Sequence, residues 1–138
     1  MSRLTLIGVA AIVVSLAVVA PAAGKHAFWQ TPSKRIHCAW FSPPSFLRCD
    51  IDGGLRPKPS RPASCRDDFG QGLEMSRTGR SKVVCAGDST NDPSARVLAY
   101  GTNWKRGGFT CKVRTTGVRC TNASGHGFFL SRERWSRF

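Results

Sequence analysis

The spacing of six cysteines constrains the fold of this chain more than any other feature of its sequence. Ten residues separate Cys38 from Cys49, and eight separate Cys111 from Cys120. Both intervals fit a β-hairpin that carries apolar residues on the cysteine side and polar residues on the other. We therefore predict two disulfide-stapled hairpins, Cys38–Cys49 and Cys111–Cys120.

In the first hairpin, pairing the cysteines places Trp40 opposite Leu47 and leaves a turn at residues 42–45. The two prolines of that turn cannot donate to a strand ladder and so belong outside it. The cysteines then face each other at a non-hydrogen-bonded pair, where Cα atoms approach to ~4.5 Å and a disulfide can close. On the outer face, His37 is expected opposite Asp50 as an exposed charge pair.

The second hairpin is expected to turn at Thr115-Thr116, with its apolar residues on the cysteine face. Upstream, the pattern of residues 97–104 predicts a strand. The chain would turn back through residues 105–108, so that this strand pairs with the second hairpin. This register places Trp104 opposite Phe109 and Tyr100 opposite Val113, all on the buried side. A further short strand is expected at residues 128–130, and the tail after it could extend that strand or form a helical turn.

Residues 53–82 are rich in proline and glycine and are expected to form a long excursion from the sheet. A third disulfide, Cys65–Cys85, would close that excursion. The predicted fold class is all-β or β-rich, a small antiparallel meander of stapled hairpins.

Metal binding has little support in the sequence. No two cysteines are closer than nine positions, whereas zinc sites need clustered ligands, and we expect no metal and no cofactor. The segment from Asp88 to Asp92 could chelate calcium, although a turn whose side chains bond its own backbone is the favoured interpretation.

The N-terminus is typical of a secretory signal peptide, predicted over residues 1–22. Arg3 supplies the positive end, and the apolar run from Leu4 to Val19 is shorter than the ~20 residues that span a bilayer. A membrane anchor is the alternative. Cleavage after Ala22, with Ala23 or Gly24 as alternative positions, would leave one domain, residues 23–138. We expect this domain to be extracellular or associated with the cell envelope, monomeric and without a transmembrane segment. An even number of cysteines in an exported chain fits a disulfide framework.

The chain is strongly basic, with 21 lysines and arginines against 8 aspartates and glutamates. Such a charge either keeps a secreted protein dispersed or attracts a polyanion. We expect a binding domain whose partner is an anionic envelope polymer or a nucleic acid. Basic residues interleaved with aromatics suit phosphate contact and base stacking. The predicted binding residues are Lys105, Arg106, Lys112, Arg114, Arg119 and Arg132.

An enzyme is the rival interpretation, a small secreted cationic hydrolase resembling a nuclease. The sequence holds no Gly-x-Ser-x-Gly or His-Glu-x-x-His motif, and paired cysteines supply no thiolate. The compact candidates are His126 and Glu133 as an acid–base pair beside Arg132. A straight strand would place His126 and Arg132 roughly 20 Å apart, so we expect no catalysis and a turn or ligand-contact role for His126.

A series of short motifs follows one order along the chain: Thr31-Pro32-Ser33, Ile36-x-Cys38, Leu47-Arg48-Cys49-Asp50-Ile51, Cys85-Ala86-Gly87-Asp88, Val97-Leu98-Ala99-Tyr100-Gly101, Gly117-Val118-Arg119-Cys120-Thr121-Asn122, Ser124-Gly125-His126-Gly127-Phe128 and Leu130-Ser131-Arg132. In these motifs the chain resembles an uncharacterised family of small secreted, disulfide-bonded actinobacterial proteins. Lys34-Arg35 departs from that family, which often has Gly-Asn at these positions. The resemblance implies a secreted disulfide-bonded domain and no catalytic residues.

Overall fold

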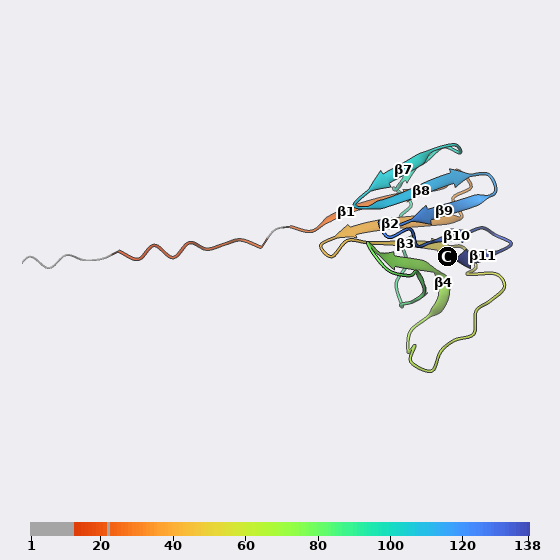
Figure 1. Ribbon diagram of the computed structural model, residues 1–138, viewed down its shortest axis with the longest axis horizontal. Coiled ribbons are helices and arrows are strands. Elements are labelled where there is room, and N and C mark those ends of the chain that lie inside the picture. The colour runs from red at the N-terminus through yellow and green to blue at the C-terminus, as the bar shows by residue number, and fades with distance from the viewer. Residues whose placement is uncertain (1–12, 22) are drawn as a thin grey trace, which may run out of the picture.

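The computed structural model describes residues 13–21 and 23–138, and its strands run from Lys25 to Arg137 (Figure 1). Residues 13–21 carry no helix or strand. Most of the predicted signal peptide, residues 1–12 and the cleavage position Ala22, lies outside the described residues. Within the described ranges, no helix is long and apolar enough to span a membrane.

The strands form two sheets. The first has six strands in the order β5-β4-β3-β2-β1-β6 and is antiparallel except where β6 runs parallel to β1. Its strands are β1 (Lys25–Gln30), β2 (Ile36–Ser42), β3 (Phe46–Ile51), β4 (Phe69–Ser76), β5 (Lys82–Cys85) and β6 (Arg96–Val97).

The second sheet is an antiparallel meander of five strands in the order β11-β10-β9-β8-β7. Its strands are β7 (Asn103–Arg106), β8 (Phe109–Arg114), β9 (Gly117–Thr121), β10 (Gly127–Leu130) and β11 (Trp135–Arg137). The all-β class predicted from the sequence is therefore confirmed.

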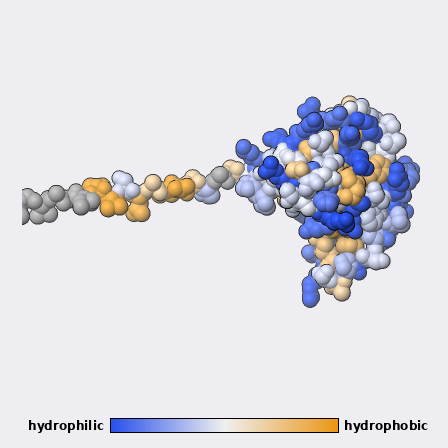
Figure 2. Space-filling model, in the orientation of Figure 1, coloured by the Kyte–Doolittle hydropathy of each residue, from blue (hydrophilic) through white to orange (hydrophobic). Residues whose placement is uncertain are grey.

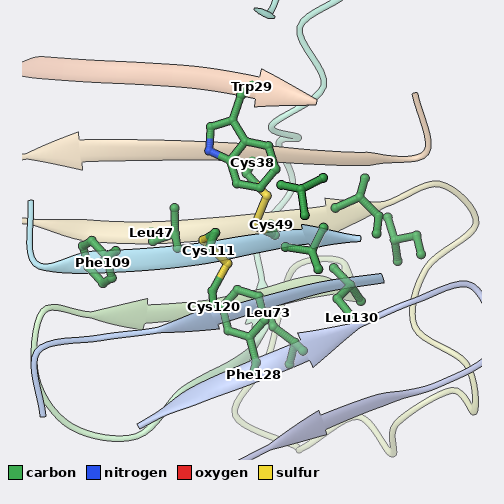
Figure 3. Close-up of a cluster of buried hydrophobic side chains, with 14 of the residues drawn as sticks. Trp29, Cys38, Leu47, Cys49, Leu73, Phe109, Cys111, Cys120, Phe128 and Leu130 are labelled. Atoms are coloured by element: carbon green, nitrogen blue, oxygen red, sulfur yellow. A yellow bond between two sulfur atoms is a disulfide. The ribbon is translucent and has the colours of Figure 1, made fainter. Parts of the chain in front are cut away.

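One hydrophobic core joins the facing sides of the two sheets (Figure 3). Trp29, Leu47 and Leu73 come from the first sheet, and Phe109 and Phe128 from the second, and all are buried. Strand alternation places these side chains on one face of each sheet and leaves polar residues on the other. The core thus fixes which residues the outer faces present.

All three predicted disulfides are present. In Cys38–Cys49 and Cys111–Cys120 the Cα atoms are 4.1 and 4.0 Å apart, as expected for residues directly opposite each other at a non-hydrogen-bonded pair. The predicted strand register of both hairpins is also observed. No cysteine of the described chain is free, which indicates an oxidising compartment.

The outer face of the first hairpin is not exposed, and the prediction of a solvated His37–Asp50 pair was wrong. His37 stands opposite Asp50 as expected, but each is only 4% exposed. The segment after β5 covers them: the Thr90 hydroxyl donates to the carbonyl of His37, and the Thr90 amide donates to Asp50. His37 instead has its Nε2 3.3 Å from Asp52.

The strand predicted over residues 97–104 is broken in two, and its register was wrong. Trp104 pairs with Cys111 rather than Phe109, because Gly107 and Gly108 form a two-residue turn with positive φ at both positions. Residues 98–102 belong to no strand, although Gly101 and Thr102 still exchange backbone hydrogen bonds with Val113 of β8, and Tyr100 is 43% exposed instead of entering the core.

Candidate functional site

The outer face of the second sheet gathers five cations, which we call the basic face: Lys105, Lys112, Arg114, Arg119 and Arg134. Alternation produces it, since Val113 and Cys111 of β8 point into the core while Lys112 between them points to solvent. In β9, Val118 and Cys120 are buried and Arg119 is exposed in the same way.

Lys112 and Arg119 stand directly opposite each other on adjacent strands. Like charges in this position repel and destabilise a sheet unless something neutralises them. The strands β7 to β10 contain no aspartate or glutamate, since none occurs between Asp92 and Glu133 in the sequence. Neither side chain takes part in a salt bridge within the described residues. The arrangement therefore favours an anion supplied from outside.

Two cations of the basic face, Arg119 and Arg134, make cation–π contacts with aromatic rings of the chain. The Phe138 ring lies over Gly127, whose added Cβ would come within 2.8 Å of it, and the Arg119 guanidinium lies 3.8 Å from the ring centre. Cation–π contacts of this kind orient a guanidinium. The contact therefore orients the Arg119 guanidinium on this face and covers one side of the Phe138 ring.

The second ring repeats this arrangement. Phe129 lies over Gly117, whose Cβ would come within 2.7 Å, and the Arg134 guanidinium is 4.6 Å from the ring centre. The Phe129 and Phe138 rings of this face are therefore each already in contact with an arginine of the chain.

The structure separates the six predicted binding residues. Lys105, Lys112, Arg114 and Arg119 share the basic face, and Lys105 and Lys112 are exposed. Arg114 is half-buried and fixed, because its guanidinium donates to the carbonyls of Thr102 and Val113 and to the Asn103 side chain.

The other two lie elsewhere. Arg106 points away from the basic face and lies 4.8 Å from the centre of the Trp40 ring. Arg132 lies in the β10–β11 turn, 3.7 Å from Glu133.

The candidate acid–base residues are not brought together. The chain does bend back at Ser131, whose hydroxyl binds the backbone of the turn and lets β11 pair with β10. However, His126 precedes β10 and Glu133 follows it, so the two lie at opposite ends of a strand about 13 Å long. The His126 amide donates to the Asn122 side chain within its own turn.

Sequence reasoning missed a buried charge cluster under the segment after β5. The Arg48 guanidinium donates to both carboxylate oxygens of Asp50 at 2.8 Å, and to the carboxylate and carbonyl of Asp88 at 2.7 Å. Burial lowers the pKa of Arg48, but the hydrogen bonds and charges of Asp50 and Asp88 outweigh it and raise the pKa above its ordinary value. The spacing of Arg48 and Asp50, two apart on one strand face, was the available signal.

Asp88 and Asp92 have separate roles. The hydrogen bond and charge of Arg48 lower the pKa of Asp88. Asp92 accepts hydrogen bonds from the amide and hydroxyl of Ser94, the local turn that the sequence favoured.

The excursion after β3 forms a cavity of about 780 Å³ against the outer side of the first sheet. Its walls include His37 and Gln71, whose buried Nδ1 and Oε1 atoms have no hydrogen-bond partner among the described residues. Arg56, Lys58 and Arg61 also line it. Its shape is held by Trp135, which donates to the Pro57 carbonyl, and by the Cys65–Cys85 disulfide.

A family model, described as "Family of unknown function (DUF6636)", matches residues 8–138. The chain belongs to this family. A comparison with curated proteins and a comparison with solved structures found no match. Membership supplies no site residues, so the function of this DUF6636 protein has to be argued from its own geometry.

Proposed function

We propose that this DUF6636 protein is a secreted binding domain that holds an anionic polymer of the cell envelope against its basic face. The observation that carries the proposal is the opposition of Lys112 and Arg119 on adjacent strands, in a part of the sheet, β7 to β10, whose strands contain no aspartate or glutamate. A row of phosphates or carboxylates placed over these strands would relieve the repulsion and release counterions.

The extent of the basic face favours a polymer over a small ion as its ligand. Lys105 on β7, Lys112 on β8 and Arg119 on β9 extend it across neighbouring strands, which lie ~4.8 Å apart. The visible side of the folded part is hydrophilic over much of its area (Figure 2). An extended ligand can contact several of these cations at once.

Charge, rather than base stacking, is the property that this face would recognise. Single-stranded nucleic acid binders combine basic grooves with aromatic rings on which bases stack. Here Phe129 and Phe138 are covered by Arg134 and Arg119. A backbone polymer such as poly(glycerol phosphate) therefore suits the face better than a nucleic acid that needs free rings.

The test compares two double variants with the same net charge. Lys112→Gln/Arg119→Gln removes the opposed pair, and Lys25→Gln/Arg66→Gln removes two exposed cations elsewhere. Binding of soluble poly(glycerol phosphate) at low salt is measured by calorimetry. The first variant should bind roughly tenfold more weakly, whereas the control should change by less than about twofold.

Equal loss in both variants would mean that net charge alone attracts the polymer, and the proposal would fail. Turnover of the polymer, or of RNA or DNA, would instead favour the hydrolase interpretation.

A further inference from the structure

We infer that the polymer leaves the basic face at Arg114 and continues through a cationic groove across the end of the two sheets, which selects a flexible single-chain polyanion over a rigid duplex. This inference rests on the proposed function. It adds a second segment to the binding site and specifies the ligand class.

The groove consists of three hollows that share their walls. The first, of about 250 Å³, lies among the β1–β2, β8–β9 and β10–β11 turns. The second, of about 670 Å³, shares Arg35, Arg132 and Glu133 with the first. The third is the cavity of about 780 Å³ under the excursion, which shares Asp52 and Arg56 with the second. Together they run from the turns of the second sheet to the outer side of the first.

Arg114 connects the groove to the basic face. By alternation it points to the same side of β8 as Lys112, and it also lines the first hollow. Its guanidinium is held by Thr102 and Asn103, so its position at this junction is fixed. A chain that passes Lys112 and Arg119 therefore meets the groove at Arg114.

Cations outnumber carboxylates along the groove. Six line it in the order of the hollows: Arg114, Arg132, Arg35, Arg56, Lys58 and Arg61. Of the carboxylates, Glu133 lies 3.7 Å from Arg132, Asp52 lies 3.3 Å from His37, and Asp50 is bound by Arg48. Asp68 is the remaining carboxylate in these walls. Six cations against four carboxylates leave a net positive charge along the groove, which attracts a chain of negative groups.

A ligand that contacts both the basic face and the groove has to bend where the two meet. The site therefore favours a flexible ligand over a rigid one. A domain of about 115 residues has a radius of gyration of about 13 Å. Duplex DNA has a persistence length of about 500 Å, so it stays straight over such a distance. It could contact the basic face or the groove but not both. A single polyphosphate chain bends freely and could contact both.

The experiment uses linear polyphosphate in a short and a long form, with affinities compared per phosphate. The short form is cut to cover only the basic face. Wild-type protein should bind the long form about tenfold more tightly, because the groove adds a second linked segment. In Arg35→Gln/Arg56→Gln this gain should drop to about twofold while short-chain binding stays unchanged. The control is again Lys25→Gln/Arg66→Gln, which should keep the gain.

Failure of the inference and failure of the proposed function give different results. If Lys112→Gln/Arg119→Gln has no effect on either form, the basic face is not the site and the proposed function fails. If the face variant weakens both forms but Arg35→Gln/Arg56→Gln keeps the full gain, only the groove is wrong. Duplex DNA that binds as tightly per phosphate as long polyphosphate would also overturn the preference for a flexible chain.

Discussion

Replacing Arg48 with methionine should cost about 3–5 kcal/mol of folding free energy, the usual cost of removing one partner of a buried ion pair. The side chains of Arg48 and Asp50 are only 7% and 5% exposed. Without the guanidinium, the Asp50 carboxylate would keep a single hydrogen bond, from the amide of Thr90. A charge left buried in this way is what makes the change expensive, and the segment after β5 would also lose its contact through Asp88.

At about 4 °C per kcal/mol for a domain of this size, the melting temperature should fall by roughly 12–20 °C. Urea unfolding followed by tryptophan fluorescence, together with calorimetry, measures both quantities. The double variant Arg48→Met/Asp50→Leu should recover part of the loss, because it removes the unpaired buried charge, although the Thr90 amide then loses its acceptor. Arg35→Gln, at an exposed arginine, is the control and should change stability by less than about 0.5 kcal/mol. A loss below about 1 kcal/mol for Arg48→Met, or no recovery in the double variant, would refute this account of the cluster.

Two further predictions concern Asp88 in this cluster and Gly127 in the second sheet. Because Arg48 lowers the pKa of Asp88, this pair stabilises the fold above the ordinary aspartate pKa of about 4, and its contribution should be lost as the pH falls below that value. Urea unfolding from pH 7 to pH 2 tests this, and Asp88→Asn should flatten the acid limb; a loss confined to pH 5–7 would contradict it. Gly127→Ala should cost about 1–3 kcal/mol, because the new methyl group would overlap the backbone carbonyl of Cys120 on β9 and also the Phe138 ring. Gly87→Ala has open space around it and should be nearly neutral, so equal effects of the two substitutions in thermal unfolding would be a contradiction.

The stapled hairpins could be predicted because their determinants are local. Alternation, the proline turn and the cysteine spacing all agree on one register, and the structure has that register. The predicted register between residues 97–104 and the second hairpin was wrong because of one detail. The sequence fits both a two-residue turn at Gly107-Gly108 and a four-residue loop over residues 105–108. The choice between them moves Trp104 from Phe109 to Cys111.

Features that depend on distant segments could not be predicted in the same way. His37 is buried because Thr90, far along the chain, covers it, and no pattern within the hairpin reports that. The groove likewise depends on Arg35, Arg56 and Arg132, which come together only after both sheets have packed. The cations of β8 and β9 were predictable as a face, because strand periodicity alone places them on the solvent side.

The strand β1 was missed altogether, although it supplies Trp29 to the core. Its sequence lies directly after the predicted signal peptide and carries no turn signal or cysteine that would mark it. Its partners are β2 and the distant β6, so its role is set by tertiary pairing.

The salt dependence of poly(glycerol phosphate) binding tests the central claim most directly. For a single-chain polyanion, the logarithm of the binding constant falls by about 0.7 per neutralised phosphate for each unit of log salt. A short form that covers only the basic face and contacts all five of its cations would give a slope of about −3.5, and Lys112→Gln/Arg119→Gln should make it shallower by about 1.4. The account predicts both values. An affinity that is flat with salt, or a slope that the variant leaves unchanged, would contradict it.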